Sequence, residues 1–485
     1  MTGLFQNKSN TLFYLLLFTY GFLGCLHLQS LPIAWTDEVM NLDPALQWHK
    51  HGIYKGFLWP NQGSDHLFLS YPPLIQVFHI GTMYLLPFDI FWMRLPFLIL
   101  HLTTIWMVYR IAFFYSKNNL LALLLSALFM FDKVVFEISR SMRVEVLEMF
   151  LIASFFYFKT IKPNIIIRAL CIGLLITAHL KMWPIALVMF IFNWKDAISI
   201  REKITVLFLS AFPLLIFCFA IQFQFEALYT QMFVQASKHQ AVGSIWDRLT
   251  AGILQRFWPV YLEQIWVIPI AFYMLWRALK QVLNGQNSVA SWCYVIGFLF
   301  TTLFMAGHYR YWPPLYLCGI ILLSADQNIH QYTKNPMIQK YGVALILIFL
   351  PGFVLRHYVA ELQQKERNPA IAIQWLETSI SKEDKTLILG DALAFYTTKN
   401  PNWDYGMEIY PQNLHPEKYK KMYYLSRDTF LNQKPFSSYP VKHIKPLGII
   451  NRFVRGETYA GLHLYEITNL SQYHLLTKKF SKDYE

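Results

Sequence analysis

The sequence TLFYLLLFTYGFLGCLHLQSLPI at residues 11–33, followed by AWTDE at 34–38, decides the fold. The stretch 11–33 carries no Lys, Arg, Asp or Glu, and about twenty such residues cross a bilayer as a helix. It is too long for a cleaved signal peptide and lacks a small-residue cleavage site, so we expect it to remain as an anchor. Asp37 and Glu38 stand at its exit, where acids gain nothing from burial and need another role.

The whole chain repeats this apolar character. Of its 485 residues 55% are hydrophobic, 17% are aromatic and only 15% are charged, which a soluble domain could not bury. The net charge of +13 does not indicate nucleic acid, because many Lys and Arg lie in short loops between apolar segments. The five cysteines stand singly within apolar segments, with neither disulfide nor metal spacing. We therefore predict a mainly α-helical, polytopic membrane protein.

Apolar segments recur along residues 1–358, and we expect about 11–13 transmembrane helices there. The rest of the chain, 359–485, is polar and contains no apolar run long enough for a span. Within it 386–390 and 462–467 alternate like strands and 369–380 reads as a helix, which predicts a small soluble α/β domain. The apolar segments after the first are 72–90, 92–115, 119–136, 141–160, 165–179, 182–193, 203–222, 258–280, 289–306, 311–325 and 339–356.

The basic loops predict the orientation in the membrane. Lys and Arg concentrate in alternating short loops, which we expect to face the cytoplasm. Alternation from these loops places the first external loop, 34–71, and the domain 359–485 on the outer side. The scheme gives eleven spans, and it requires that 72–90 does not cross fully and that Lys181 divides 165–193 into two spans. The basic loops are those around 159–168, 195–203, 277–280 and 334–340.

Short motifs follow one another in a definite order. They are Asp37-Glu38 after the first span, Tyr71-Pro72-Pro73-Leu74, Arg94-Leu95-Pro96, Arg143-Val144-Glu145, Gly173 with Lys181 eight residues later, and His308-Tyr309-Arg310-Tyr311. This series resembles the lipid-linked-sugar glycosyltransferases with the multi-span GT-C fold, over roughly residues 12–320. Among them it is most similar to the protein O-mannosyltransferases and to the bacterial aminoarabinose transferases that modify lipid A.

The resemblance implies a chemical role for the first two acids. Asp37 would be the base that takes the acceptor's proton, across the anomeric carbon from the leaving phosphate, so that transfer inverts the sugar. Glu38 would orient the site or hold a neighbouring helix. The alternative is that both acids only stabilise the N-terminus of a helix at 38–50 through its dipole.

The resemblance also implies that Glu145 is the second catalytic acid, at a position where relatives usually have aspartate. It would reach the acceptor, or pair with Arg143 or Arg140, which we expect to contact substrate. Lys181 stands in an apolar stretch, where lysine is costly unless it is paired or faces water. We expect Lys181 to contact the donor phosphate, and extension of its ammonium to the membrane interface is the alternative.

Three aromatic or basic residues complete the expected substrate site. Arg310 would bind phosphate, with an interfacial belt of Arg and aromatic residues as the alternative, and His308 lies beside it. Tyr71 stands where relatives carry a lysine or histidine. Because a tyrosine at this position removes one possible phosphate contact, Lys181 and Arg310 become stronger candidates for binding the donor phosphate.

No cofactor is expected. A divalent metal is possible but not favoured, because His49, His51, His66 and His79 show no metal-ligand spacing. The expected partners are a polyprenyl-phosphate sugar, membrane lipids and an acceptor that is lipid A, another envelope glycan or protein. The short loops favour a bacterial cytoplasmic membrane. One rival function is a transporter or flippase, which would have acids and bases near mid-bilayer and an internal repeat, and the sequence shows neither. The other rival is a non-catalytic assembly protein, which would not need Asp37.

Overall fold

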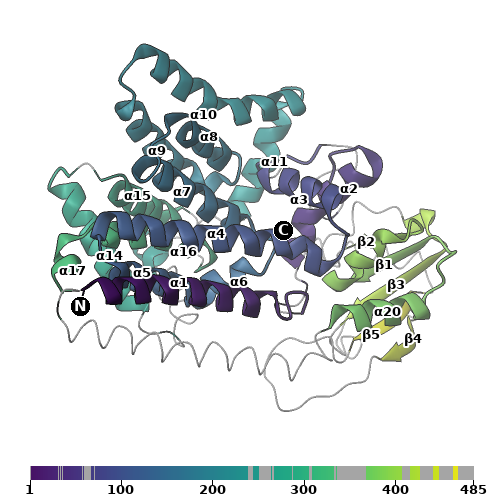
Figure 1. Cartoon of the computed structure of the whole chain (residues 1–485). Helices are drawn as coiled ribbons and strands as arrows, with labels where there is room; N and C mark the ends of the chain where they lie inside the picture. The colour runs from purple at the N-terminus through teal and green to yellow at the C-terminus, as the bar shows by residue number, and fades with distance from the viewer. Residues whose placement is uncertain are drawn as a thin grey trace. The chain divides into compact units, whose positions relative to one another are not determined.

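The chain forms two compact units, one of Met1–Cys25, Leu69–Ile75 and Pro96–Val354, the other of Leu26–Phe68, Gln76–Leu95 and Leu355–Glu485. A computed structural model describes residues 2–30, 32, 34, 36–56, 58, 67–69, 71–238, 244–250, 264, 267–286, 288–304, 309–332, 335, 368–406, 416–426, 441–446 and 462–467. Helices make up most of the described chain, and its strands belong to the C-terminal part (Figure 1).

Most of the apolar segments expected from the sequence contain helices close to the expected bounds, but the first helix begins nine residues before the expected segment 11–33 and ends eight residues before its end. These helices are α1 Thr2–Cys25, α3 Leu74–Leu85, α4 Ile90–Ser116, α5 Asn119–Met130, α6 Lys133–Ser139, α7 Val144–Thr160, α8 Ile165–Ile176, α9 Trp183–Asp196, α10 Ile200–Ala220, α14 Val267–Leu283, α15 Val289–Leu303 and α16 Trp312–Ser324. Shorter elements are η1 Leu180–Met182, α11 Phe225–Lys238, α12 Ile245–Thr250, η4 Tyr309–Tyr311 and α17 Gln327–Tyr332. The segment 339–356 lies outside the described residues.

Two breaks divide the apolar segments. The expected single segment 119–136 is two helices, because the Asp132 carboxylate accepts a hydrogen bond from Val135 N at 2.9 Å and starts α6 as its N-cap. The break expected at Lys181 is present as a short turn and η1, between α8 and α9. Both breaks shorten the helices on either side.

Two helices, α4 and α10, have the length and hydropathy to cross a membrane on their own, by length and composition. The other apolar segments that were found within the described helices have 10–17 residues, among them Ser9–Cys25 of α1, so these lengths give fewer full spans than the eleven expected. Along α10 large apolar side chains stay exposed, among them Ile204 at 60%, Phe208 at 54% and Phe219 at 67%. An apolar surface of this size suits contact with lipid rather than with water.

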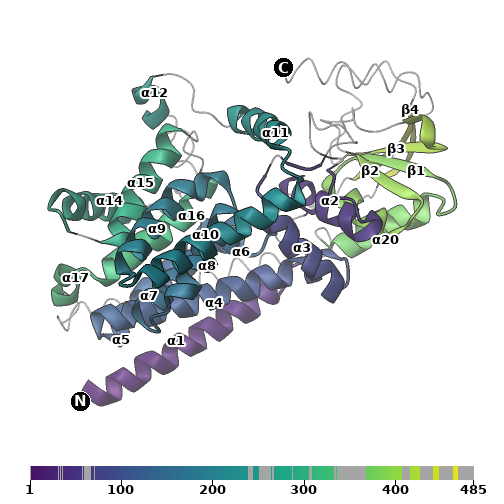
Figure 2. The same ribbon diagram turned by 90° about the horizontal axis from the view of Figure 1, so that it is seen from above.

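Close helix packing in the first unit depends on glycine. A Cβ on Gly173 of α8 would lie 2.6 Å from the Ser210 carbonyl oxygen of α10, so the two backbones touch. A Cβ on Gly21 of α1 would lie 3.0 Å from Leu102 of α4, and Figures 1 and 2 both show these two helices running side by side. Small residues at such crossings let membrane helices approach closely.

The second unit contains α2 Thr36–His51 and the C-terminal α/β domain. The helix expected at 38–50 is α2, and the one expected at 369–380 is α20 Pro369–Ser379. The domain also has η5 Ala392–Lys399, η7 Pro416–Lys418 and the strands β1 Thr386–Gly390, β2 Trp403–Gly406, β3 Lys421–Ser426, β4 Val441–Pro446 and β5 His463–Ile467. The predicted strands 386–390 and 462–467 are β1 and β5, whereas the predicted boundary at 358–359 lies outside the described residues.

The sheet has the order β2-β1-β3-β5-β4. Strand β1 is parallel to both β2 and β3, while β5 pairs antiparallel with β3 and β4. Alternate residues of adjacent strands build its core, in which Leu387, Leu389, Met422, Tyr424 and Tyr465 are buried together. Figures 1 and 2 both place α20 beside this sheet.

Candidate active site

The first turn of α2 carries the two acids, and Glu38 is fully buried in an ion pair. Arg94 of α4 donates from Nε to Glu38 Oε1 at 3.1 Å and from Nη2 to Oε2 at 2.6 Å. Its Nη1 donates to the carbonyl oxygens of Leu28, at 2.9 Å, and of Pro32, at 2.5 Å. Both carboxylate oxygens and three guanidinium nitrogens are thus engaged, in the bidentate geometry that arginine favours.

This pair explains two of the sequence motifs together. Arg94 begins the Arg-Leu-Pro motif, and its ion pair with Glu38 joins the first turn of α2 to the start of α4. Asp37, one residue earlier, is only half-buried, and its main-chain carbonyl accepts a hydrogen bond from Asn41 Nδ2 at 2.9 Å. Because Glu38 is fixed, the turn that carries Asp37 is fixed as well.

The second candidate site is a cluster of buried charges in the other unit. Arg143, the N-cap of α7, donates to both carboxylate oxygens of Glu145, at 2.9 and 3.0 Å. Lys181 Nζ donates to Glu145 Oε1 at 2.9 Å and lies 3.3 Å from Oε2 of Glu148. Lys181 and both glutamates are buried, whereas 12% of the Arg143 side chain is exposed. Two basic and two acidic side chains therefore meet in this cluster.

The turn after α8 positions Lys181. His179 is the N-cap of η1, and its Nδ1 accepts a hydrogen bond from Lys181 N at 3.2 Å. The Lys181 ammonium lies 4.4 Å from the centre of the Tyr311 ring, a cation–π distance. The Tyr71 ring lies edge-on to His179, with 5.4 Å between ring centres. Residues far apart in the sequence therefore meet around one lysine.

The Pro-Pro motif has a structural part in this meeting. Because Pro72 and Pro73 lack N–H groups, Leu74 supplies the first free amide, which donates to the Thr177 carbonyl oxygen at 2.9 Å. Thr177 is the C-cap of α8, so the start of α3 is tied to the turn that leads to Lys181. This bond holds Tyr71 beside His179.

The remaining predicted residues fall in different places. The Arg140 guanidinium is buried over the Phe136 ring at 5.2 Å, and Arg310 lies in η4 next to Tyr311. His308 lies outside the described residues. Within the part of the chain that the structure describes, no group of three or more His, Cys, Asp or Glu side chains is arranged to hold a metal ion.

Sequence reasoning missed Glu148, Arg94 as the partner of Glu38, and the aromatic ring of Tyr311. A signal for Glu148 was present, since an acid inside an apolar helix is costly and indicates a partner. The Arg94 signal was weaker, because a motif match does not say which acid an arginine meets across 56 positions.

Comparisons with known proteins agree with this architecture. No protein-family model matches the chain, and no curated protein matches its sequence. The solved structures that it resembles include ArnT from Cupriavidus metallidurans bound to undecaprenyl phosphate, with 11% identity and a TM-score of 0.54. The same protein in the apo state gives 10% identity and a TM-score of 0.55, and each likeness covers 95% of this chain and 98% of ArnT. The chain therefore has the polytopic GT-C fold of the aminoarabinose transferase ArnT, the fold expected from its motifs.

Proposed function

We propose that this protein is a membrane glycosyltransferase that moves a sugar from a polyprenyl phosphate to an acceptor of the bacterial envelope. The observation that carries the proposal is the likeness to ArnT over 95% of the chain, since one ArnT structure holds undecaprenyl phosphate. The acceptor is lipid A, another envelope glycan or a protein. The reaction takes place at the outer face of the cytoplasmic membrane, on the side of the first external loop and the C-terminal domain.

Asp37 is the proposed base. Its carboxylate takes the proton of the acceptor's nucleophilic group while that group attacks the anomeric carbon, and polyprenyl phosphate leaves on the opposite side. The buried Glu38–Arg94 pair supports this role, because it fixes the first turn of α2 without using Asp37. A fixed base costs less reorganisation at the moment of transfer.

Arginines are the proposed contacts of the donor phosphate. Lys181 is held by two carboxylates, so we assign it to positioning Glu145 rather than to direct phosphate binding. The Arg143 side chain is 12% exposed, and Arg140 and Arg310, together with His308, complete the proposed set. Arginine binds phosphate through two parallel N–H groups, which favours it over lysine for this task.

A transfer assay tests the proposal. The envelope lipids and glycans of a strain that lacks the gene, compared with its parent, would show which acceptor loses a sugar. Purified protein in lipid nanodiscs should then transfer that sugar from undecaprenyl phosphate to the acceptor. Retention of the whole rate by Asp37→Asn, at matched protein level, would mean that the base is a different residue.

Membrane topology gives a test that does not depend on activity. Cysteine substitutions at Lys195 and Asn400 should react with a membrane-impermeant thiol reagent from opposite sides, Asn400 from outside. Labelling of Asn400 only after the cells are opened would contradict the proposed placement of the C-terminal domain and of Asp37.

One observation favours a flippase as the second candidate. Glu145, Glu148 and Lys181 form a buried group of acids and base beside apolar helices, a feature typical of transporters. A flippase would move a fluorescent polyprenyl-phosphate sugar between leaflets of a vesicle without releasing polyprenyl phosphate. Sugar transfer to an acceptor distinguishes the two functions.

A further inference from the structure

The charge cluster around Lys181 contains a second acid, Glu148, which has far fewer partners than the first. Glu148 lies on α7 one helical turn after Glu145, and its side chain is fully buried. Neither of its carboxyl oxygens has a hydrogen-bond partner within the described chain. Lys181 Nζ, at 3.3 Å from Oε2, is the one cation that the structure describes within ion-pair distance of it. A carboxylate buried with so few partners is costly in free energy.

Glu145 binds the same lysine and is better placed to carry a negative charge. Its Oε1 accepts hydrogen bonds from Lys181 Nζ at 2.9 Å and from Arg143 Nη2 at 3.0 Å, and its Oε2 accepts one from Arg143 Nε at 2.9 Å. Glu145 also lies in the first turn of α7, where the helix dipole favours an anion, whereas Glu148 lies beyond that turn. When two buried carboxyl groups share one cation, the group with fewer partners keeps its proton.

The helices packed against α7 do not supply Glu148 with another charge. These helices include α6, α8 and α16. Their titratable side chains are Lys133 and Glu137 in α6, Arg168 and Cys171 in α8, and Tyr316 and Cys318 in α16. None of these side chains forms a hydrogen bond or an ion pair with Glu148 within the described chain. From η4, the Tyr311 ring lies over the Lys181 ammonium at 4.4 Å, so it contacts the cation and not the acid.

We propose that Glu148 is a neutral carboxylic acid in the protein without ligand, and that the cluster therefore carries one net positive charge. Lys181 and Arg143 contribute two positive charges and Glu145 contributes one negative charge, which leaves a single positive charge. A neutral acid at position 148 avoids the burial of a second anion inside an apolar helix. Glu148 thus sets the charge of the cluster without contacting a ligand.

The net positive charge makes an anion the favoured ligand of the cluster. Arg143 is the member that reaches solvent, since 12% of its side chain is exposed. Its guanidinium can turn from Glu145 to a phosphate, because Lys181 stays on Glu145 and still compensates that carboxylate. With an ionised Glu148, Lys181 would have to compensate two anions, and the release of Arg143 would cost more. That the anion is the phosphate of the polyprenyl donor rests on the proposed function.

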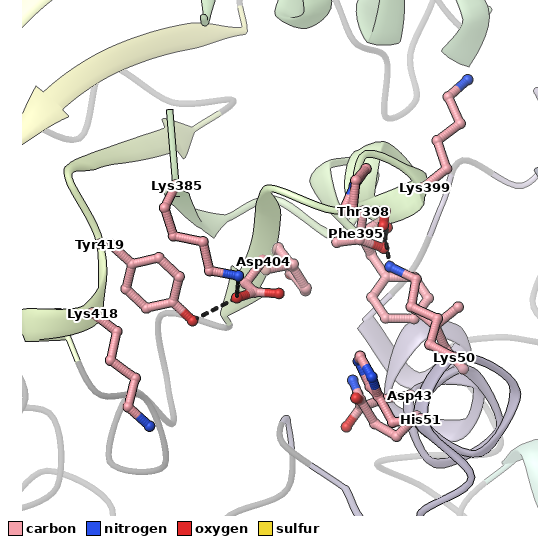
Figure 3. Close-up of a pocket in the computed structure, with 14 residues that line it drawn as sticks. Asp43, Lys50, His51, Lys385, Phe395, Thr398, Lys399, Asp404, Lys418 and Tyr419 are labelled. Atoms are coloured by element: carbon pink, nitrogen blue, oxygen red, sulfur yellow. Dashed lines mark hydrogen bonds and ion pairs between the residues drawn. The ribbon is translucent and has the colours of Figure 1, made fainter. Parts of the chain in front are cut away.

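Exposed charges elsewhere in the protein stand in different surroundings. A cavity of about 500 Å³, lined by α2, η5 and η7 in the second compact unit, has several lysines in its walls (Figure 3). Lys385 of this cavity pairs with Asp404 at 3.1 Å, and the two side chains are 45% and 43% exposed. Bulk water can therefore complete the hydrogen bonds of both groups. Burial keeps bulk water from Glu148, so its charge depends on the protein alone.

Infrared spectroscopy of the full chain tests the charge of Glu148 without any substrate. A protonated carboxyl group gives a C=O stretching band apart from the amide bands, and dodecyl maltoside micelles add no carbonyl band of their own. Near neutral pH the unmodified protein should show this band, and Glu148→Gln should lose it. Glu148→Asp should move the band, whereas the matched variant Glu145→Asp should leave it in place, because Glu145 is ionised. Identical spectra of the unmodified protein and Glu148→Gln, or a band that moves in Glu145→Asp instead, would overturn the proposal.

Binding of undecaprenyl phosphate tests the consequence for the ligand. Isothermal titration compares its affinity near neutral pH with the affinity above the pH at which the infrared band disappears. The unmodified protein should bind at least about threefold more weakly at the higher pH, because an ionised Glu148 cancels the net positive charge. Glu148→Gln stays neutral throughout and should lose less. Equal losses in the two proteins would overturn the link between Glu148 and the phosphate, since a titration of the probe or of other residues affects both alike.

The two measurements also separate this inference from the proposed function. Neither of them requires sugar transfer, so an absence of transfer together with the infrared band of Glu148 would remove only the transferase. Normal transfer by a protein in which Glu148→Gln leaves the infrared spectrum unchanged would remove only the neutral acid.

Discussion

Two groups of buried charges in this protein differ in how many of their carboxylate oxygens accept hydrogen bonds. Glu38 meets Arg94, and both its oxygens accept hydrogen bonds while the arginine also reaches two main-chain carbonyls. Lys181 meets two glutamates, of which Glu145 is well bonded and Glu148 makes a 3.3 Å ion-pair contact and no hydrogen bond within the described chain. A buried charge is stable only when its hydrogen bonds are complete.

The difference indicates different roles. In the Glu38–Arg94 pair both carboxylate oxygens are already bonded, so a ligand would have to break the pair in order to bind either residue. We therefore interpret this pair as structural. The Lys181 cluster holds a carboxylate with unused acceptor capacity, so it can change its bonds at low cost when substrate arrives. Variants at the two sites should therefore differ in what they lose.

The largest loss of stability is expected from breaking the Glu38–Arg94 pair. Arg94→Met leaves the Glu38 carboxylate buried without its cation, and should lower the free energy of unfolding by about 3–5 kcal/mol. Titration of the purified protein with sodium dodecyl sulfate measures this loss. The double variant Glu38→Met/Arg94→Met should recover most of it. A loss in the double variant equal to the sum of the losses in Arg94→Met and Glu38→Met would show that the two residues are not coupled.

The next effect separates the two adjacent acids of α2. Asp37→Asn keeps the size of the side chain but cannot take a proton, so transfer should fall by about 10²-fold or more while stability stays near that of the unmodified protein. Glu38→Gln should do the reverse and lose stability first. Measured rates and unfolding curves that rank the two variants in the opposite order would exchange their roles.

A smaller loss is expected at the better bonded glutamate of the cluster. Glu145→Gln removes the charge that Arg143 and Lys181 share, and should cost about 1–3 kcal/mol of stability. Transfer should fall less than in Asp37→Asn, because Glu145 is engaged by cations of the protein. A fall as large as that of Asp37→Asn, at matched protein level, would instead assign Glu145 to the acceptor.

The smallest effect sharpens the comparison within the cluster. Glu148→Gln makes the same chemical change one helical turn from Glu145, but it removes only one ion-pair contact. Since the burial of a poorly bonded carboxylate is itself costly, stability should change by no more than about 1 kcal/mol in either direction. A loss as large as that of Glu145→Gln would mean that both glutamates are equally bound.

The sequence predicted the elements of the fold well, because each depends on local signals. The helix expected at 38–50 runs from Thr36 to His51, and the strand expected at 386–390 has those bounds. The break at Asp132 was missed, although an N-cap residue before a short helix is also a local signal. Helices α11 and α12 were missed because they are too short and too polar for the apolar pattern of a span.

The candidate sites were predicted only as separate residues. Sequence pointed to Tyr71, Glu145 and Lys181, but their neighbours are set by contacts across large sequence distances, such as Tyr311 over Lys181. The pairing of Glu38 with Arg94 depends likewise on how α4 packs near the start of α2. The cavity of Figure 3 had no sequence signal, because its lysines are dispersed along polar segments and only folding gathers them.

The contact of the α8 and α10 backbones at Gly173 also sets a limit on how the sequence can vary. When a side chain is in the way, a neighbour can change its rotamer, but the Ser210 carbonyl oxygen has no such freedom. In a library randomised along α8 and screened for folded protein, most apolar positions should interchange Leu, Ile and Val. Position 173 should return glycine alone, so the residue of α8 without a side chain would be the one that tolerates no substitution.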